Sequence, residues 1–140
     1  MSIQYTLLDN QRDALLLVAR VLILILFAYF GTTYVFDHSS FVKYLQSVNA
    51  PTPRVTAVIG TAVEFFGTIV LLIGFWTRPV AVFFAVYTLG TAVIGHSFWD
   101  ITTPAEHHAQ FVHFLKNISI AAGFLFLALA GPGRFSLDRR

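Results

Sequence analysis

Four long apolar segments alternate with short polar stretches along this chain of 140 residues. The apolar segments are residues 14–36, 55–76, 79–98 and 112–130. Each provides roughly the 20 residues that a helix rising 1.5 Å per residue needs to cross about 30 Å of hydrocarbon. The pattern therefore predicts an all-α fold in which residues 1–140 form a single integral-membrane domain, a four-helix transmembrane bundle.

The two longer polar loops contain further helix signals. Residues 40–48 have apolar positions at helical spacing and follow a cap at Ser39 or Ser40, which predicts a short amphipathic helix lying in the interface. Residues 103–106 combine a capping box with proline at the first helical position. We therefore expect the last helix to begin near Pro104 and to project from the membrane.

The composition narrows the classes of function. Hydrophobic residues make up 56% of the chain and charged residues only 11%, which excludes an ordinary soluble domain. The chain has no cysteine, so disulfides, thiolate nucleophiles, iron–sulfur clusters and thiolate zinc sites are excluded, and redox chemistry requires a bound cofactor. A net charge of +2 provides no basic face for nucleic acid.

The distribution of basic residues predicts the orientation. With four spans, both termini lie on the same side of the membrane as the turn at Arg78, whereas the two opposite loops carry Lys43 and Arg54. The basic residues on the terminal side are Arg12, Arg78, Arg134, Arg139 and Arg140. By the positive-inside rule, we expect a multi-pass membrane protein with both termini in the cytoplasm.

Small residues recur at helical spacing and predict which faces of the spans pack together. In the second span the pattern places Glu64 on the same face as Gly60 and Gly67. Membrane helices associate at such small residues because lipid provides no hydrophobic force between them. Glu64 is therefore expected to point into the bundle near the midplane of the membrane.

Five polar residues of the spans are the candidate ligand-binding or proton-relay residues: Glu64, Lys116, Asn117, His96 and Arg20. One interpretation makes Glu64 a carboxylate that exchanges protons or anchors a ligand, with the lysine, amide and histidine as donors to a quinone oxygen. The other makes it half of a static ion pair with Arg20 or Lys116.

The histidines do not have the spacing of a metal site. His107 and His108 are adjacent, and His113 follows without an i, i+3 or i, i+4 partner, so the sequence predicts no metal centre. His96 and His113 are the one pair inside the bundle that could face each other as axial ligands of a haem, and the sequence disfavours haem.

Several segments resemble the DoxX family of small bacterial inner-membrane proteins. The resemblance rests on the ending Gly131-Pro132-Gly133-Arg134-Phe135-Ser136-Leu137-Asp138, on residues 89–100, on residues 116–121, and on Arg20, Glu64, Gly74 and Arg78. It covers nearly the whole chain. Where many relatives have His-Gly followed by Gln-Lys late in the first span, this chain has Tyr29-Phe30-Gly31-Thr32-Thr33, so the role of that motif does not carry over.

The resemblance implies a four-span bundle, and for some members a role as subunit of a thiosulfate:quinone oxidoreductase or of another membrane redox complex. Together with the polar residues of the spans, it leads us to expect a membrane protein that binds a quinone-like ligand, alone or as the membrane subunit of an oxidoreductase with redox partner proteins. The alternatives are a proton-coupled carrier centred on Glu64, which with four short spans would need to form a homo-oligomer, and a structural membrane partner without a ligand.

Overall fold

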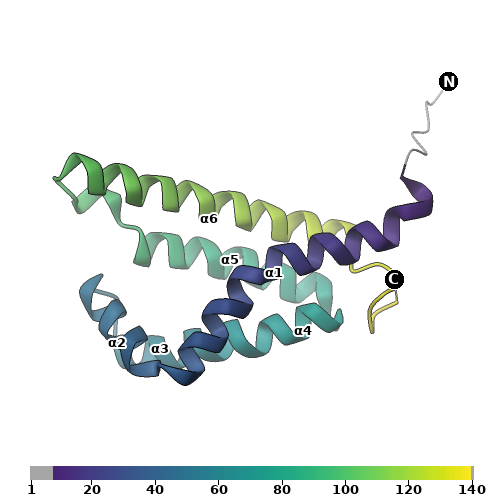
Figure 1. The fold of residues 1–140 in the computed structure, drawn as a ribbon, viewed down its shortest axis with the longest axis horizontal. Coiled ribbons are helices and arrows are strands. Elements are labelled where there is room, and N and C mark those ends of the chain that lie inside the picture. The colour runs from purple at the N-terminus through teal and green to yellow at the C-terminus, as the bar shows by residue number, and fades with distance from the viewer. Residues whose placement is uncertain (1–7, 140) are drawn as a thin grey trace.

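The structure, a computed structural model, describes residues 8–139, and these form helices joined by turns (Figure 1). The helices are η1 (Asp9–Gln11), α1 (Arg12–Phe36), α2 (His38–Ser47), α3 (Pro53–Ala62), the π-helical segment η2 (Val63–Gly67), α4 (Thr68–Ile73), α5 (Thr77–Gly95), η3 (Phe98–Asp100) and α6 (Pro104–Ala130). Four spans are long and apolar enough to cross a membrane: Asp9–Phe36, Pro53–Ile73, Thr77–Asp100 and Pro104–Ala130. The predicted all-α four-helix bundle is confirmed.

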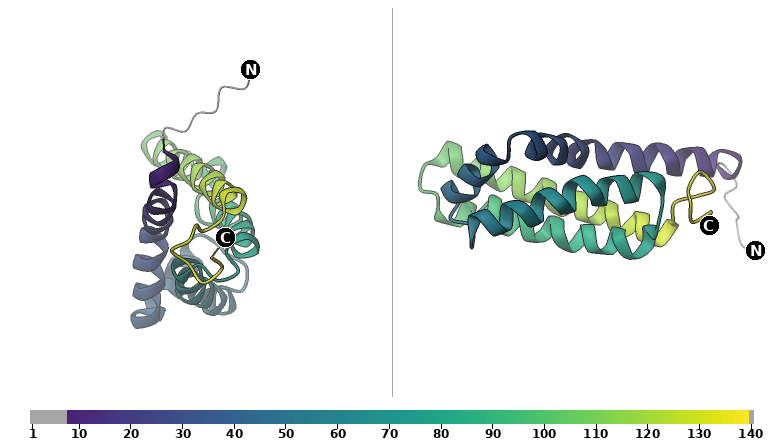
Figure 2. Two further views of the ribbon diagram at one scale, coloured as in Figure 1. Left: turned by 90° about the vertical axis from the view of Figure 1, so that its right-hand side faces the viewer. Right: turned by 90° about the horizontal axis from the view of Figure 1, so that it is seen from below.

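The spans form two groups that diverge toward one end. Helices α5 and α6 are an antiparallel pair, and α1 packs on the second span, which consists of α3, η2 and α4 in succession. Both ends of the described chain lie at one end of the bundle, hereafter the terminal end, and α2 lies at the opposite end, hereafter the α2 end (Figures 1 and 2). The two groups are close together at the terminal end and separate toward the α2 end (Figure 1).

The larger of the two core clusters extends from the middle of the bundle toward the terminal end. The rings of Phe27, Phe84 and Phe124 meet at centroid distances of 5.2 to 5.4 Å in its centre. Buried small residues bring the spans together, as the spacing predicts: Ala57 and Gly60, then Ala81, Ala85, Thr88 and Ala92, then Ala121. Many large apolar side chains remain exposed on the outside of all four spans, where lipid covers them.

The short helix in the first loop confirms one prediction and corrects its cap. Helix α2 buries Phe41 and Leu45 against the bundle. Its cap is Asp37 rather than Ser39 or Ser40, because the Asp37 carboxylate accepts hydrogen bonds from the Ser40 backbone N–H at 3.2 Å and the Ser39 hydroxyl at 3.1 Å. These hydrogen bonds lower the pKa of Asp37, so the cap is ionised at neutral pH.

The start of α6 is also as predicted, but without the capping box. The helix begins at Pro104, and His107, His108 and His113 are helical. The side chain of Thr103 makes no cap hydrogen bond. Proline at the first turn has no N–H to satisfy and a φ suited to a helix, which is sufficient to start the helix here.

The C-terminal segment 131–139 folds across the terminal end of the bundle (Figure 2). Its Asp138 carboxylate accepts hydrogen bonds from the backbone N–H groups of Trp76 at 3.0 Å and Thr77 at 2.8 Å, at the start of α5. The Asp138 and Leu137 N–H groups in turn donate to the carbonyls of Gly74 and Ile73. The segment therefore caps the end of α4 and the start of α5, although it lies far from both in the sequence.

Asp138→Asn is expected to destabilise the protein by about 1 kcal/mol, the usual loss when a helix N-terminus loses its capping side chain. The amide has one acceptor oxygen, whereas the carboxylate uses both oxygens on two N–H groups. Thermal unfolding in detergent measures the effect, and Asp100→Asn, an exposed position in η3, is the matched control. Equal melting temperatures for both variants would show that the segment does not cap α5.

Candidate functional site

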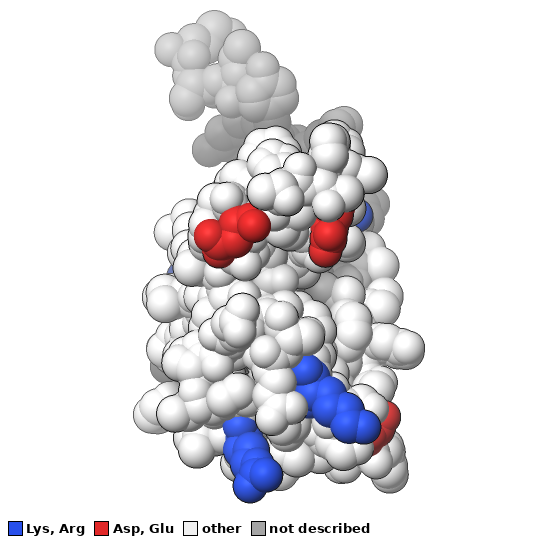
Figure 3. All heavy atoms as spheres, turned by 90° about the vertical axis from the view of Figure 1, so that its left-hand side faces the viewer, with Lys and Arg blue, Asp and Glu red and all other residues white. Residues whose placement is uncertain are grey.

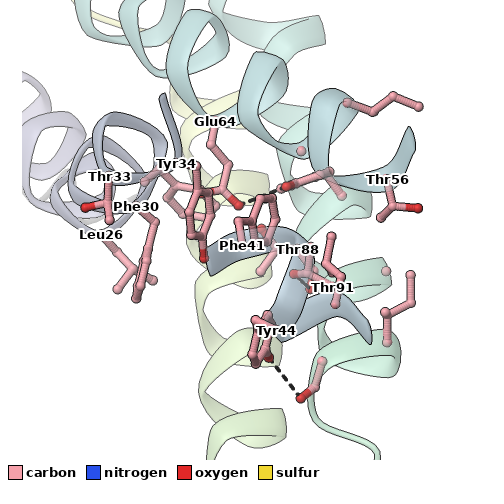
Figure 4. A pocket seen from close by; sticks show the side chains of 18 of the residues that line it. Leu26, Phe30, Thr33, Tyr34, Phe41, Tyr44, Thr56, Glu64, Thr88 and Thr91 are labelled. Carbon is pink, nitrogen blue, oxygen red and sulfur yellow. Dashed lines mark hydrogen bonds between the residues drawn. The ribbon is translucent and has the colours of Figure 1, made fainter. Parts of the chain in front are cut away.

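A cleft of about 630 Å³ separates the two groups of spans at the α2 end (Figure 4). One wall comes from the later part of α1 and from α3, the other from α5 with Asn117 of α6, and α2 covers the cleft. The lining residues are Leu26, Phe27, Phe30, Thr33, Tyr34, Asp37, Ser40, Phe41, Tyr44, Leu45, Thr56, Ile59, Gly60, Glu64, Tyr87, Thr88, Gly90, Thr91, Ile94, Gly95, His96 and Asn117. Its size lies within the range of small-molecule sites.

Glu64 and Tyr87 form a hydrogen-bonded pair at the inner limit of the cleft. The Tyr87 hydroxyl donates to Oε1 of Glu64 at 2.9 Å, and the glutamate side chain is only 9% exposed. Each residue lies near the middle of its span, so the pair sits at the depth where an isolated carboxylate is most costly. The hydroxyl satisfies one oxygen, and the other is left for a ligand, a proton or a water molecule.

Glu64 belongs to the π-helical segment Val63–Gly67. One extra residue in a turn rotates the side chains that follow, and such segments are frequent at functional sites. Helix α1 approaches this segment through Gly31, where a Cβ atom would lie 2.8 Å from the Glu64 carbonyl carbon and the Phe65 nitrogen. The close contact fixes the backbone on both sides of the carboxylate. Hydrophobic periodicity gives no sign of the π-helical turn, and the sequence analysis missed it.

Aromatic rings form a flat wall of the cleft. The rings of Tyr34 and Phe41 stack with centroids 3.7 Å apart and an angle of 3° between their planes, and Phe30 stacks on Tyr34 at 5.6 Å (Figure 4). Tyr44 of α2 donates its hydroxyl to the Gly95 carbonyl at 3.3 Å and so ties the cover of the cleft to the end of α5. Burial raises the pKa of Tyr44, which keeps this donor protonated.

Two threonines of α5 add polar groups to the opposite wall. The Thr91 hydroxyl donates to the Thr88 carbonyl at 2.9 Å. The Thr88 hydroxyl is buried and has no hydrogen-bond partner. A buried hydroxyl without a partner costs free energy, and a hydrogen bond to it would remove that cost.

The structure brings three of the five predicted site residues to one cleft. Glu64, Asn117 and His96 all line it. Lys116 does not, because it follows the helix one residue before Asn117, a rotation of about 100°, and is exposed on the outside of α6. His96 lies at the rim, where its Nδ1 is 2.8 Å from Oε1 of Gln110.

Arg20 lies at the terminal end of the bundle, so it is not the partner of Glu64 that one of the two interpretations assigned to it. Its guanidinium is 1% exposed at the terminal end, where Nη1 donates to the Pro132 carbonyl at 3.0 Å and Nη2 donates to the Phe135 carbonyl. The negative charge of Asp138 is also close enough to act on it. Arg20 therefore anchors the C-terminal segment, and Tyr87 is the partner that the sequence analysis missed for Glu64.

One signal could have identified Tyr87. Tyrosines of membrane proteins gather at the two interfaces, whereas this one falls near the middle of a span, at the same depth as Glu64. A phenol at that depth requires a partner.

The arrangement of the histidines does not suit a haem between them. The rings of His96 and His113 stack with centroids 5.2 Å apart and 20° between planes, so their faces, not their nitrogens, point at each other. Within residues 8–139, no group of three His, Asp or Glu side chains is arranged to hold a metal ion.

The sequence comparisons agree with this architecture. The DoxX family model matches residues 15–97, which include nearly all of α1, the second span and all of α5. The chain belongs to the DoxX family. This DoxX protein is 46% identical over 129 residues to the inner membrane protein YphA of Escherichia coli, covering 92% of this chain and 91% of the relative. It is 36% identical over 127 residues to the inner membrane protein YqjF of the same organism, covering 91% and 92%.

A more distant likeness is to a protein of a eukaryote. The Surfeit locus protein 4 homolog of Schizosaccharomyces pombe is 28% identical over 102 residues, which are 72% of this chain and 29% of the relative. No solved structure matches the chain. The close relatives are thus bacterial inner-membrane proteins of almost the same length.

Proposed function

We propose that the cleft of this DoxX protein binds a quinone-like ligand, a flat ring with two carbonyl oxygens, inside the membrane. The observation that carries the proposal is the combination of a flat aromatic wall, Tyr34 on Phe41, with the Glu64–Tyr87 pair in one apolar cleft. Small-molecule sites typically combine such apolar walls with a few placed polar groups. The family membership and the inner-membrane relatives are consistent with a membrane-dissolved ligand.

The polar residues of the cleft have separate roles in this proposal. The hydroxyl of Thr88 and the amide of Asn117 are donors for the carbonyl oxygens of the ring. The Glu64 carboxyl group, held by Tyr87, takes up or releases a proton. A bound quinone supplies the electron-accepting carbonyls, and the electrons come from a redox partner. The chain thus acts as a binding protein or as the membrane subunit of an oxidoreductase.

The packing below the cleft favours binding over transport. The core cluster that contains the Phe27, Phe84 and Phe124 rings extends from the middle of the bundle toward the terminal end, so the cleft ends there. A proton-coupled carrier centred on Glu64 would need a path through these rings. Proton-dependent flux into vesicles that Glu64→Gln abolishes would support the carrier and contradict the binding role.

The proposed orientation places the cleft toward the outer leaflet. Arg12, Arg78, Arg134 and Arg139 lie at the terminal end, and Arg140 lies outside the described residues. The α2 end presents charges of both signs among uncharged surface (Figure 3). By the positive-inside rule the terminal end faces the cytoplasm.

The binding role predicts that Glu64→Gln and Tyr87→Phe each weaken binding of a decyl-chain benzoquinone by about tenfold, or about 1.4 kcal/mol, because each removes one polar group of the Glu64–Tyr87 pair at the cleft. Equilibrium binding to purified protein in nanodiscs measures this. The chain offers matched controls, since Glu106 and Tyr29 are exposed and lie outside the cleft.

Glu106→Gln and Tyr29→Phe are therefore expected to bind like the wild type. Organic extraction of protein purified from membranes tests the same point with the native ligand. Equal binding and equal retention in the cleft variants and the controls would contradict the proposed site.

A further inference from the structure

One side of the cleft, between α3 and α5, combines an open backbone position with a lipid-facing apolar residue. Ile59 of α3 and Gly90 of α5 both line the cleft, and both are exposed residues of the spans. A Cβ atom added to Gly90 would meet no atom within 4 Å. The cleft therefore reaches the lipid-facing surface at this position.

Packing does not explain this glycine. Every other glycine within the described helices has a neighbour that its missing side chain makes room for: the Glu64 backbone at Gly31, Phe41 at Gly60, Phe84 at Gly67, Tyr44 at Gly95 and Ile23 at Gly123. Gly90 has no such neighbour and no positive φ. Glycine in a helix interior costs about 1 kcal/mol relative to alanine, and here no close packing offsets this cost.

The other side of the cleft, between α1 and α6, is occupied by larger side chains. It is lined by Leu26 and Phe30 of α1, and the Phe30 ring is held between Tyr29 and Tyr34 at centroid distances of 5.2 and 5.6 Å. Large side chains thus occupy that side, whereas on the opposite side the position of Gly90 itself is left without a side chain. A ligand that enters between α1 and α6 must displace these side chains, whereas a ligand that enters beside Gly90 meets no side chain at that position.

We propose that the gap beside Gly90 is a lateral portal through which a membrane-dissolved ligand reaches the cleft, and through which the apolar chain of the bound ligand extends into the lipid. The inference rests on the proposed function and deepens it, because it assigns the ligand to amphiphiles with a polar ring and an apolar chain. The ring lies among the polar groups near Thr88 and Thr91, and the chain leaves past Ile59. Gly90 keeps this path free.

Thiol labelling tests the portal without using a quinone. Because the natural chain has no cysteine, Thr91→Cys places the single thiol inside the cleft, and Val93→Cys places one on the exposed face of the same helix. The probe is N-decylmaleimide dissolved in lipid nanodiscs, and a sulfonated maleimide in water is the comparison. Each cysteine variant is combined with Gly90→Phe, whose side chain would block the gap. Gly90→Leu adds a smaller blocking side chain, and Gly90→Ala is the control that leaves the gap open.

In the Thr91→Cys protein, Gly90→Phe is expected to slow labelling by N-decylmaleimide by about tenfold, the equivalent of about 1.4 kcal/mol in the barrier. Gly90→Ala is expected to leave the rate unchanged, and Val93→Cys is expected to react at the same rate in all backgrounds. If neither Gly90→Phe nor Gly90→Leu changes the rate at which Thr91→Cys is labelled, the portal is overturned and a route between α1 and α6 is indicated. If the expected labelling pattern is observed but the protein does not bind quinone, the result contradicts the proposed function and not the portal.

Discussion

Gly31→Leu is expected to separate α1 from the π-helical segment and to lower the stability of the bundle by about 3 kcal/mol or more, at or beyond the upper end of overpacking effects. Even the first carbon of the new side chain would lie 2.8 Å from backbone atoms of Glu64 and Phe65, which cannot rotate away as a side chain can. The same displacement moves Glu64 and disrupts the cleft.

The smaller substitution Gly31→Ala is expected to destabilise the bundle less than Gly31→Leu. Its steric cost of about 1–3 kcal/mol exceeds the gain in helix propensity of at most about 1 kcal/mol, so a net loss of about 1–2 kcal/mol is expected. Gly90→Ala is the control, since its Cβ meets no atom and the propensity gain remains. Thermal unfolding in detergent measures both. Equal stabilisation by alanine at the two positions would show that α1 and η2 are not in close contact.

Arg20→Met is expected to release the C-terminal segment and to cost about 3 kcal/mol, counted as two hydrogen bonds to a charged group at about 1.5 kcal/mol each. The side chain of methionine fills much of the space but leaves the carbonyls of Pro132 and Phe135 without their donor. Pro132 is itself fully buried, so its carbonyl cannot turn to water unless the segment moves.

Two measurements follow the release of the segment. The melting temperature should fall, and trypsin should cleave faster after Arg134, whose backbone N–H is held by Asp13 at 3.0 Å in the folded protein. Arg54→Met removes an exposed arginine at the α2 end and is the control. If Arg20→Met and Arg54→Met melt and are cleaved alike, the segment is not anchored by Arg20.

The pattern of apolar and small residues was enough to predict the spans and the faces on which they pack. The first span shows why: Arg20, Leu24, Phe27 and Gly31 share one stripe, and all four are buried. Spacing alone identifies a face, because a helix repeats every 3.6 residues. The same reasoning placed Glu64 inside the bundle, where it is buried.

Spacing does not identify partners across the bundle. Arg20 and Glu64 are both buried, and pairing them was the simplest way to satisfy two charges. The pairing failed because two groups became available only through tertiary structure: the carbonyls of the C-terminal segment for Arg20 and the phenol of Tyr87 for Glu64. In the sequence, that segment contributes to the family resemblance but gives no sign that its carbonyls accept hydrogen bonds from Arg20.

The π-helical turn and the open position at Gly90 also could not be predicted from the sequence. A single π turn changes the register by one residue, which apolar periodicity over a whole span does not resolve. Gly90 is one of several glycines in the spans, and only the coordinates distinguish a glycine that allows packing from one that faces open space.

Photoaffinity labelling with an azidobenzoquinone that carries a decyl chain, followed by peptide mass spectrometry, tests the binding role of the cleft most directly. The account predicts adducts on residues that line the cleft, such as Tyr34, Phe41 and Thr91, which disappear with excess unlabelled quinone and decrease in Glu64→Gln. Adducts spread over the lipid-facing surface, for example on Phe126 and Leu129, and not displaced by excess quinone, would contradict it.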